Sequence, residues 1–132
     1  MGLNKSVKAV ALVGCLLSGG LIAEAGTSWG ETEYRSVPGT NGTSNSSGQT
    51  KAQTNASSDL SISKISDTNK MDTRAIGGGS NGAGAKGAWV RDTNVGSYAI
   101  PNSTEKGWGT SLEFSSDLLS NGVSITYKWK SN

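Results

Sequence analysis

The chain has no histidine, and its only cysteine is Cys15, so much of the side-chain chemistry used by enzymes is missing from its 132 residues. Ser-His-Asp and Cys-His catalytic arrangements need imidazole, and conventional zinc sites need imidazole or thiolate ligands. These catalytic mechanisms and zinc binding are therefore excluded. One cysteine also leaves no disulfide within the chain, so packing alone must hold the fold together.

The chain also lacks a large excess of charge of either sign. It has twelve Lys and Arg against ten Asp and Glu, and a formal net charge of +2. Lys5, Lys8 and Glu24 precede Gly26, so ten positive and nine negative residues remain from Gly26 onward. This balance argues against nucleic acid or an anionic membrane as an electrostatically driven partner.

No apolar run is long enough to span a membrane, and the most apolar segment has the features of a secretion signal. Lys5 and Lys8 form a basic start, residues 9–23 are uncharged and mostly apolar, and small residues lead to a cleavage point between Ala25 and Gly26. A membrane-spanning helix needs about 20 apolar residues. We therefore predict that residues 1–25 are removed and that a cysteine-free mature chain without a transmembrane segment is secreted.

Lipid anchoring through Cys15 is the alternative. Leu12 to Cys15 matches the short pattern after which bacterial lipoproteins are cleaved and acylated on the cysteine. Only six uncharged residues separate Lys8 from Cys15, whereas the apolar core of a signal is usually about 7 to 15 residues long. Release is therefore favoured over anchoring.

Apolar side chains are almost absent from residues 36–58, which are rich in Ser, Thr, Asn and Gly. Such a segment buries too little surface to offset its ordering entropy. The composition predicts a flexible, disordered N-terminal segment over 26–58, ahead of a domain at 59–132. Within it, Trp29 and Tyr34 lie on a short extended stretch that either pairs with the domain edge or hangs free.

The β pattern is clearest near the end of the chain. Residues 123–130 alternate apolar and polar side chains without a break, which is typical of a strand with one buried face. A second alternating run covers 108–114, and Asn121-Gly122 is a pair that favours hairpin turns. We expect these two runs to pair antiparallel.

Shorter β candidates are separated by Gly, Asn and Asp, and they lie at 60–62, 71–76, 88–91 and 97–100. They predict an all-β fold, either a small antiparallel β-sandwich or a partly open barrel. A domain this small needs large rings in its core. The rings expected to face inward are Trp89, Tyr98, Trp108, Phe114, Tyr127 and Trp129.

Two short motifs resemble ligand sites, and neither has the context that the ligand needs. Residues 82–87 satisfy Gly-x-Gly-x-x-Gly but precede a strand instead of a helix. Asp92 and Asn94 have the spacing of calcium ligands, but Gly96 stands where an EF-type loop requires an oxygen ligand and Ser103 stands where it requires the closing Glu. We therefore expect an ordinary loop, an ordinary turn, and no metal or cofactor.

An enzyme without histidine could use paired carboxylates held in one cleft. At least two of four residues would have to converge there: Asp92, Glu105, Glu113 and Asp117. A chain this small rarely shapes such a cleft, so we expect a non-enzymatic protein with no catalytic residue. The carboxylate-dependent enzyme is the least favoured alternative.

Export and small size favour a secreted protein that acts at or on a cell envelope, with an envelope component, a glycan or a protein as its partner. Residues 26–29, Gly-Thr-Ser-Trp, resemble the Gly-Thr-Trp start of the lactococcin 972 type of bacteriocin, a group of small cysteine-free exported β proteins. That resemblance implies an antimicrobial role. The inserted Ser28 and the polar segment 36–58 depart from the pattern, as does the absence of histidine.

The alternative function is a carbohydrate-binding or adhesive module, in which exposed aromatic rings stack on sugars. The candidate binding aromatics are Trp29, Trp89, Tyr98 and Trp108. Exposure of these rings on one flat face of the fold would distinguish this function from a purely structural role in the core.

Overall fold

The structure is a computed structural model that describes residues 26–66, 70–78 and 85–132. The predicted signal with Cys15, and residues 82–84 of the glycine motif at 82–87, lie outside these residues. The described chain is all-β and contains no helix, so no helix there could cross a membrane. The all-β prediction is confirmed.

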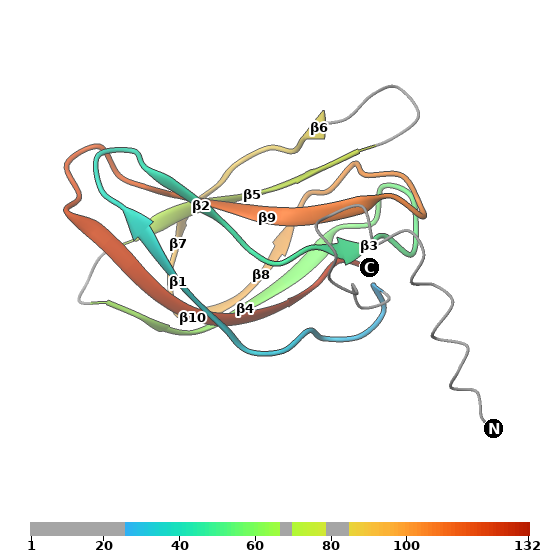
Figure 1. Ribbon diagram of the computed structural model, residues 1–132, viewed down its shortest axis with the longest axis horizontal. Helices are drawn as coiled ribbons and strands as arrows, with labels where there is room; N and C mark the ends of the chain where they lie inside the picture. The colour runs from blue at the N-terminus through green and yellow to red at the C-terminus, as the bar shows by residue number, and fades with distance from the viewer. Residues whose placement is uncertain (1–25, 67–69, 79–84) are drawn as a thin grey trace.

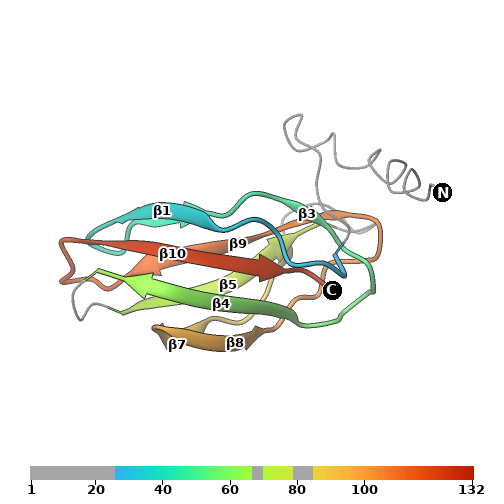
Figure 2. The ribbon, with the colours of Figure 1, turned by 90° about the horizontal axis from the view of Figure 1, so that it is seen from below.

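Within the described residues, ten strands form two antiparallel sheets packed face to face (Figure 1). The four-stranded sheet has the order β1-β10-β4-β8, and Figure 2 shows β1, β10 and β4 side by side. The second sheet has the order β2-β9-β5-β6, with β3 also on β9 and β7 on β5. The strands are β1 (Glu33–Pro38), β2 (Thr43–Asn45), β3 (Gln49–Thr50), β4 (Ser58–Ile65), β5 (Met71–Gly77), β6 (Ala85–Lys86), β7 (Val90–Thr93), β8 (Gly96–Ile100), β9 (Gly109–Ser116) and β10 (Gly122–Lys130).

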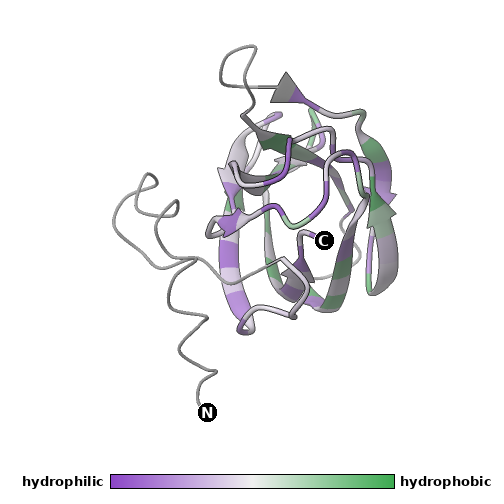
Figure 3. Cartoon of the chain, turned by 90° about the vertical axis from the view of Figure 1, so that its right-hand side faces the viewer, coloured by the Kyte–Doolittle hydropathy of each residue, from purple (hydrophilic) through white to green (hydrophobic). Residues whose placement is uncertain are grey.

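The core lies between the sheets because each long strand alternates buried and more accessible residues. Figure 3 shows hydrophobic and hydrophilic bands along the strands. Phe114 of β9 and Tyr127 of β10 meet across it edge to face, with ring centroids 4.9 Å apart. The buried apolar set is Val37, Leu60, Ile62, Met71, Ala75, Ile100, Leu112, Phe114, Val123, Ile125, Tyr127 and Trp129. The sandwich alternative is the one that the structure adopts.

The expected hairpin between 108–114 and 123–129 is wrong. β9 pairs with β5 and β2, whereas β10 pairs with β1 and β4 in the other sheet. Residues 117–121 carry the chain across the sandwich instead of turning it back within one sheet. Both strands bury one face in the same core. The apolar–polar alternation of the two runs is therefore the same whether they are neighbours in one sheet or face each other from opposite sheets.

The flexible segment predicted over 26–58 is also corrected by the structure. β1 pairs with β10 over six residue pairs, and β2 and β3 pair with β9. Val37 adds to the core, and Gln49 is buried with its Nε2 donating to the backbone oxygen of Trp129 at 2.9 Å. Backbone pairing and buried polar hydrogen bonds hold this segment, and composition alone does not reveal them.

Three of the six rings expected in the core are fully buried, namely Phe114, Tyr127 and Trp129. Tyr98 is half-buried and packs against the core from β8. Trp89 is also half-buried, but the guanidinium carbon of Arg74 lies 4.2 Å from its ring centroid. The expectation for Trp108 is wrong, because this side chain is exposed.

Candidate functional site

One outer surface gathers exposed aromatic and basic side chains, and it belongs to the four-stranded sheet. Its strand residues alternate with buried ones along β1, β4, β8 and β10, so they point away from the core. We call it the Trp29 face, formed by Trp29, Tyr34, Asp59, Ser61, Lys64, Ser97, Ala99, Thr126, Lys128 and Lys130.

Strand register sets the layout of this face. Lys130, Asp59 and Ala99 are paired across β10, β4 and β8. Lys128 lies opposite Ser61, which in turn lies opposite Ser97. In the next row, Thr126 separates Tyr34 of β1 from Lys64 of β4. A bulge between Thr126 and Tyr127 shifts the register with β4 and places Lys64 in this row.

Trp29 is held against β10 by its own flanking backbone and by two ammonium groups. The amide of Gly30 donates to the backbone oxygen of Trp129 at 2.9 Å. The Nζ atoms of Lys128 and Lys130 lie 5.1 Å and 5.3 Å from the Trp29 ring centroid, within the range of cation–π attraction. Trp29 keeps 41% of its surface exposed.

A shallow cleft of about 340 Å³ lies beside the indole, and it is lined by Trp29, Asp59, Leu60, Ser97, Tyr98 and Ala99. Two of the four candidate aromatics therefore line one cavity. Tyr98 contributes from the inward side of β8, with its hydroxyl accepting a hydrogen bond from the Asn94 amide at 2.9 Å. A ligand in the cleft would meet the Trp29 ring, the Asp59 carboxylate and the Ser97 hydroxyl, together with the backbone of β4 and β8.

The other two candidate aromatics lie on the second sheet. Trp89 stacks with Arg74 of β5, and Arg74 also pairs with Glu113 at 2.6 Å. Trp108 packs over Gly78, where an added Cβ would come within 2.9 Å of its ring. The four predicted rings therefore do not form one flat face.

The structure adds residues to the site that were not selected from the sequence. Lys130 lies 3.6 Å from the Asp59 carboxylate, which also accepts a hydrogen bond from Asn132. Lys64 and Lys128 are exposed and have no carboxylate partner within the described ranges. The alternation over 123–130 places Lys128 and Lys130 on one side, but only strand register brings Lys64 and Tyr34 beside them.

Asp92 and Asp117 do approach each other, together with Asp72, and each offers an oxygen atom within 4.8 Å of the others. Asp72 already accepts from the Arg91 guanidinium at 2.5 Å and from the Asp92 amide at 3.0 Å. These contacts occupy both oxygens of Asp72. Glu113 is paired with Arg74 instead. The structure therefore brings together two of the four carboxylates considered from the sequence, Asp92 and Asp117, but neither lines the cleft beside Trp29.

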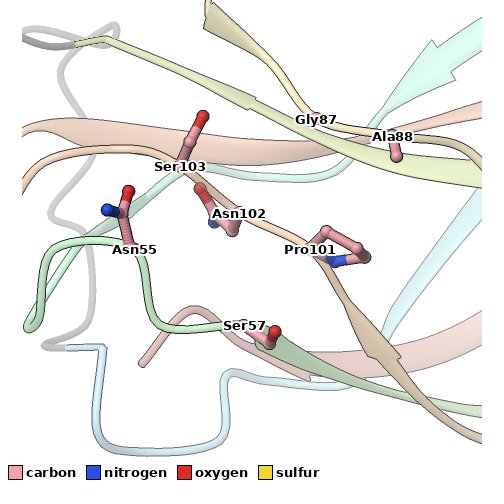
Figure 4. Close-up of a pocket in the computed structure, with 7 residues that line it drawn as sticks. All are labelled: Asn55, Ser57, Gly87, Ala88, Pro101, Asn102 and Ser103. Carbon is pink, nitrogen blue, oxygen red and sulfur yellow. The ribbon is translucent and has the colours of Figure 1, made fainter.

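A second cleft of about 310 Å³ lies where three loops meet (Figure 4). Its lining is small and uncharged, and comprises Asn55, Ser57, Gly87, Ala88, Pro101, Asn102 and Ser103. The Asn102 amide is used internally, since its Nδ2 donates to Ser58 and Thr110 and its Oδ1 accepts from the Thr104 amide. This cleft therefore offers fewer binding groups than the Trp29 face.

The chain matches no protein-family model, no curated protein and no solved structure.

Proposed function

We propose that this protein is a non-enzymatic binding protein that recognises a glycan of a cell envelope through the Trp29 face. The observation that carries the proposal is the exposed indole of Trp29, held over Lys128 and Lys130 beside an open cleft. This proposal joins the envelope role expected from the sequence with its carbohydrate-binding alternative.

The chemistry of the face suits a sugar polymer. The C–H faces of a pyranose ring stack on an aromatic ring, and its hydroxyls need donors and acceptors beside that ring. Asp59 and Ser97 line the same cleft as Trp29, and the Lys128 ammonium lies next to the Trp29 ring. An open cleft on a sheet surface accommodates an extended chain more readily than a compact metabolite, which a deeper pocket would enclose.

A retention assay tests the proposal with the chain from Gly26 to Asn132. Binding to isolated peptidoglycan and to insoluble polysaccharides is measured for the wild type, Trp29→Ala and Trp108→Ala. The two tryptophans are matched, since each is 41% exposed. We expect Trp29→Ala to weaken binding about tenfold or more, the effect of losing an aromatic hot spot, and Trp108→Ala to bind like wild type.

Two outcomes would contradict the proposal: retention that survives Trp29→Ala, or retention that Trp108→Ala weakens equally. Growth of the same cells is recorded in parallel. Inhibition that depends on Trp29 supports the antimicrobial role implied by the bacteriocin resemblance. Retention without inhibition supports adhesion.

A further inference from the structure

The charges of the Trp29 face are unlike those of the chain as a whole. From Gly26 onward, positive and negative residues nearly balance at ten and nine. The outward positions of β4 and β10 hold Lys64, Lys128 and Lys130 against the single carboxylate of Asp59. Basic groups are therefore concentrated on the surface that carries the exposed ring.

Two of these lysines are available to a ligand. Asp59 lies near Lys130 and compensates part of its charge. Lys64 and Lys128 have no such neighbour among the residues that the structure describes. They lie on adjacent strands and adjacent rows, so their backbones are roughly 8 Å apart by the usual spacings of a sheet. Long flexible stems let both ammonium groups reach one anionic group.

We propose that the glycan bound by the Trp29 face is an acidic polysaccharide whose sugars carry carboxylate groups. This inference rests on the proposed function and specifies its ligand class. A uronic acid carries the carboxylate on the same ring that presents an apolar face. One sugar can therefore stack on Trp29 while its carboxylate meets Lys128, whose Nζ lies 5.1 Å from the centre of the indole. Lys64 is placed to receive the carboxylate of a neighbouring sugar.

The number of basic groups favours this ligand over nucleic acid. Nucleic-acid binding gains its affinity from neutralising many phosphates, whereas this face offers two uncompensated lysines and a third paired with Asp59. A polysaccharide obtains the remainder of its binding from ring stacking and from hydroxyl contacts with residues such as Ser61 and Ser97.

The test uses polygalacturonate and its fully methyl-esterified form, which share a backbone and differ in charge. Affinity electrophoresis of the chain from Gly26 to Asn132 compares wild type with four variants: Lys64→Gln/Lys128→Gln, Lys64→Arg/Lys128→Arg, Lys86→Gln and Trp29→Ala. Lys86 is an exposed lysine on β6 of the other sheet, and it serves as the matched control. Single-stranded DNA is the control polymer for simple cation exchange.

We expect wild type to bind the acidic polymer at least fivefold more tightly than the ester, and salt to reduce this preference. The double Gln variant should lose the preference, the double Arg variant should keep it, and Lys86→Gln should match wild type. Trp29→Ala should weaken binding to both polymers.

Equal, Trp29-dependent binding of both polymers would overturn the acidic ligand and leave the proposed glycan function standing. DNA bound as tightly as the acidic polymer, or a preference unchanged in the double Gln variant, would also overturn it. No binding to either polymer, together with no retention on peptidoglycan or the insoluble polysaccharides, would remove both proposals.

Discussion

The side-chain ammonium of Lys51 donates a hydrogen bond to the backbone oxygen of Asn132 at 2.8 Å, deep inside the protein. The same nitrogen donates to the backbone oxygens of Gln53 and Ala56. The amides of Ala52 and Gln53 also donate to the Asn132 oxygen. One buried lysine thus joins the segment after β3 to the segment after β10, and burial lowers its pKa from the ordinary value of 10.5.

Replacing Lys51 with methionine should therefore destabilise the fold. The change keeps the side-chain volume but removes the donor shared by three backbone oxygens, those of Gln53, Ala56 and Asn132. A lost charged hydrogen bond with a buried acceptor left behind costs about 2 to 3 kcal/mol. Urea unfolding measures the loss. Lys86→Met, at an exposed site, should change stability by no more than about 0.5 kcal/mol, and equal effects at both sites would contradict this role of Lys51.

Tyr127 should make the stability fall at alkaline pH. Its hydroxyl donates to the Glu33 carboxylate at 2.6 Å, and burial, with this neighbouring carboxylate, raises the pKa of Tyr127 above its ordinary value of 10.0. Above pH 10 the unfolded chain loses this proton and the folded chain keeps it, so the unfolded state gains stability. Below pH 10 the contribution of Tyr127 is fully present.

The measurement compares wild type with Tyr127→Phe, which has no titrating hydroxyl at this position. The free energy of unfolding of wild type, minus that of the variant, should fall by about 1.4 kcal/mol between pH 8 and pH 11. Groups shared by both proteins cancel in this difference. A difference that stays constant over the range would show that Tyr127 ionises equally in both states.

Neighbouring positions on β1 distinguish a structural strand from a flexible tether. Val37 is 1% exposed and lies opposite Val123, whereas Ser36 points outward. Val37→Asp buries an unpaired charge and should cost about 4 kcal/mol or more, while Ser36→Asp should change stability by about 0.5 kcal/mol or less. Thermal unfolding monitored by circular dichroism measures both. If the two variants had the same stability, segment 26–58 would be a tether after all.

Gly122 should resist substitution because of its backbone conformation at the start of β10. Its φ is 120°, and an added Cβ would lie 3.3 Å from the Val37 oxygen. Gly122→Ala should therefore cost about 1 to 3 kcal/mol. Gly109→Ala provides the control, because no atom lies within 4 Å of the added Cβ and its φ is not positive. Comparable denaturation midpoints for the two variants would refute this strain.

The sequence alone predicts part of the Trp29 face. Trp29 was among the candidate aromatics, and the alternation over 123–130 puts Lys128 and Lys130 on one side of a strand. Tyr34 and Lys64 were not selected, because their proximity to these residues depends on which strands flank β10 and on the bulge at Thr126. The pairing register between two strands that are distant in the chain does not change the pattern of apolar and polar residues in either strand.

The sequence by itself determined the all-β class and the inward faces of β9 and β10, because side chains alternate along a strand whatever its neighbours are. Only the tertiary structure decided that β9 and β10 lie in opposite sheets, and that the polar segment before Ser58 supplies β1, β2 and β3. Strand pairing is made by backbone N–H and C=O groups that every residue type except proline carries, so composition does not specify it. The hydrogen bond from buried Lys51 to the backbone oxygen of Asn132 is likewise recognisable only when chain segments 81 residues apart are brought together.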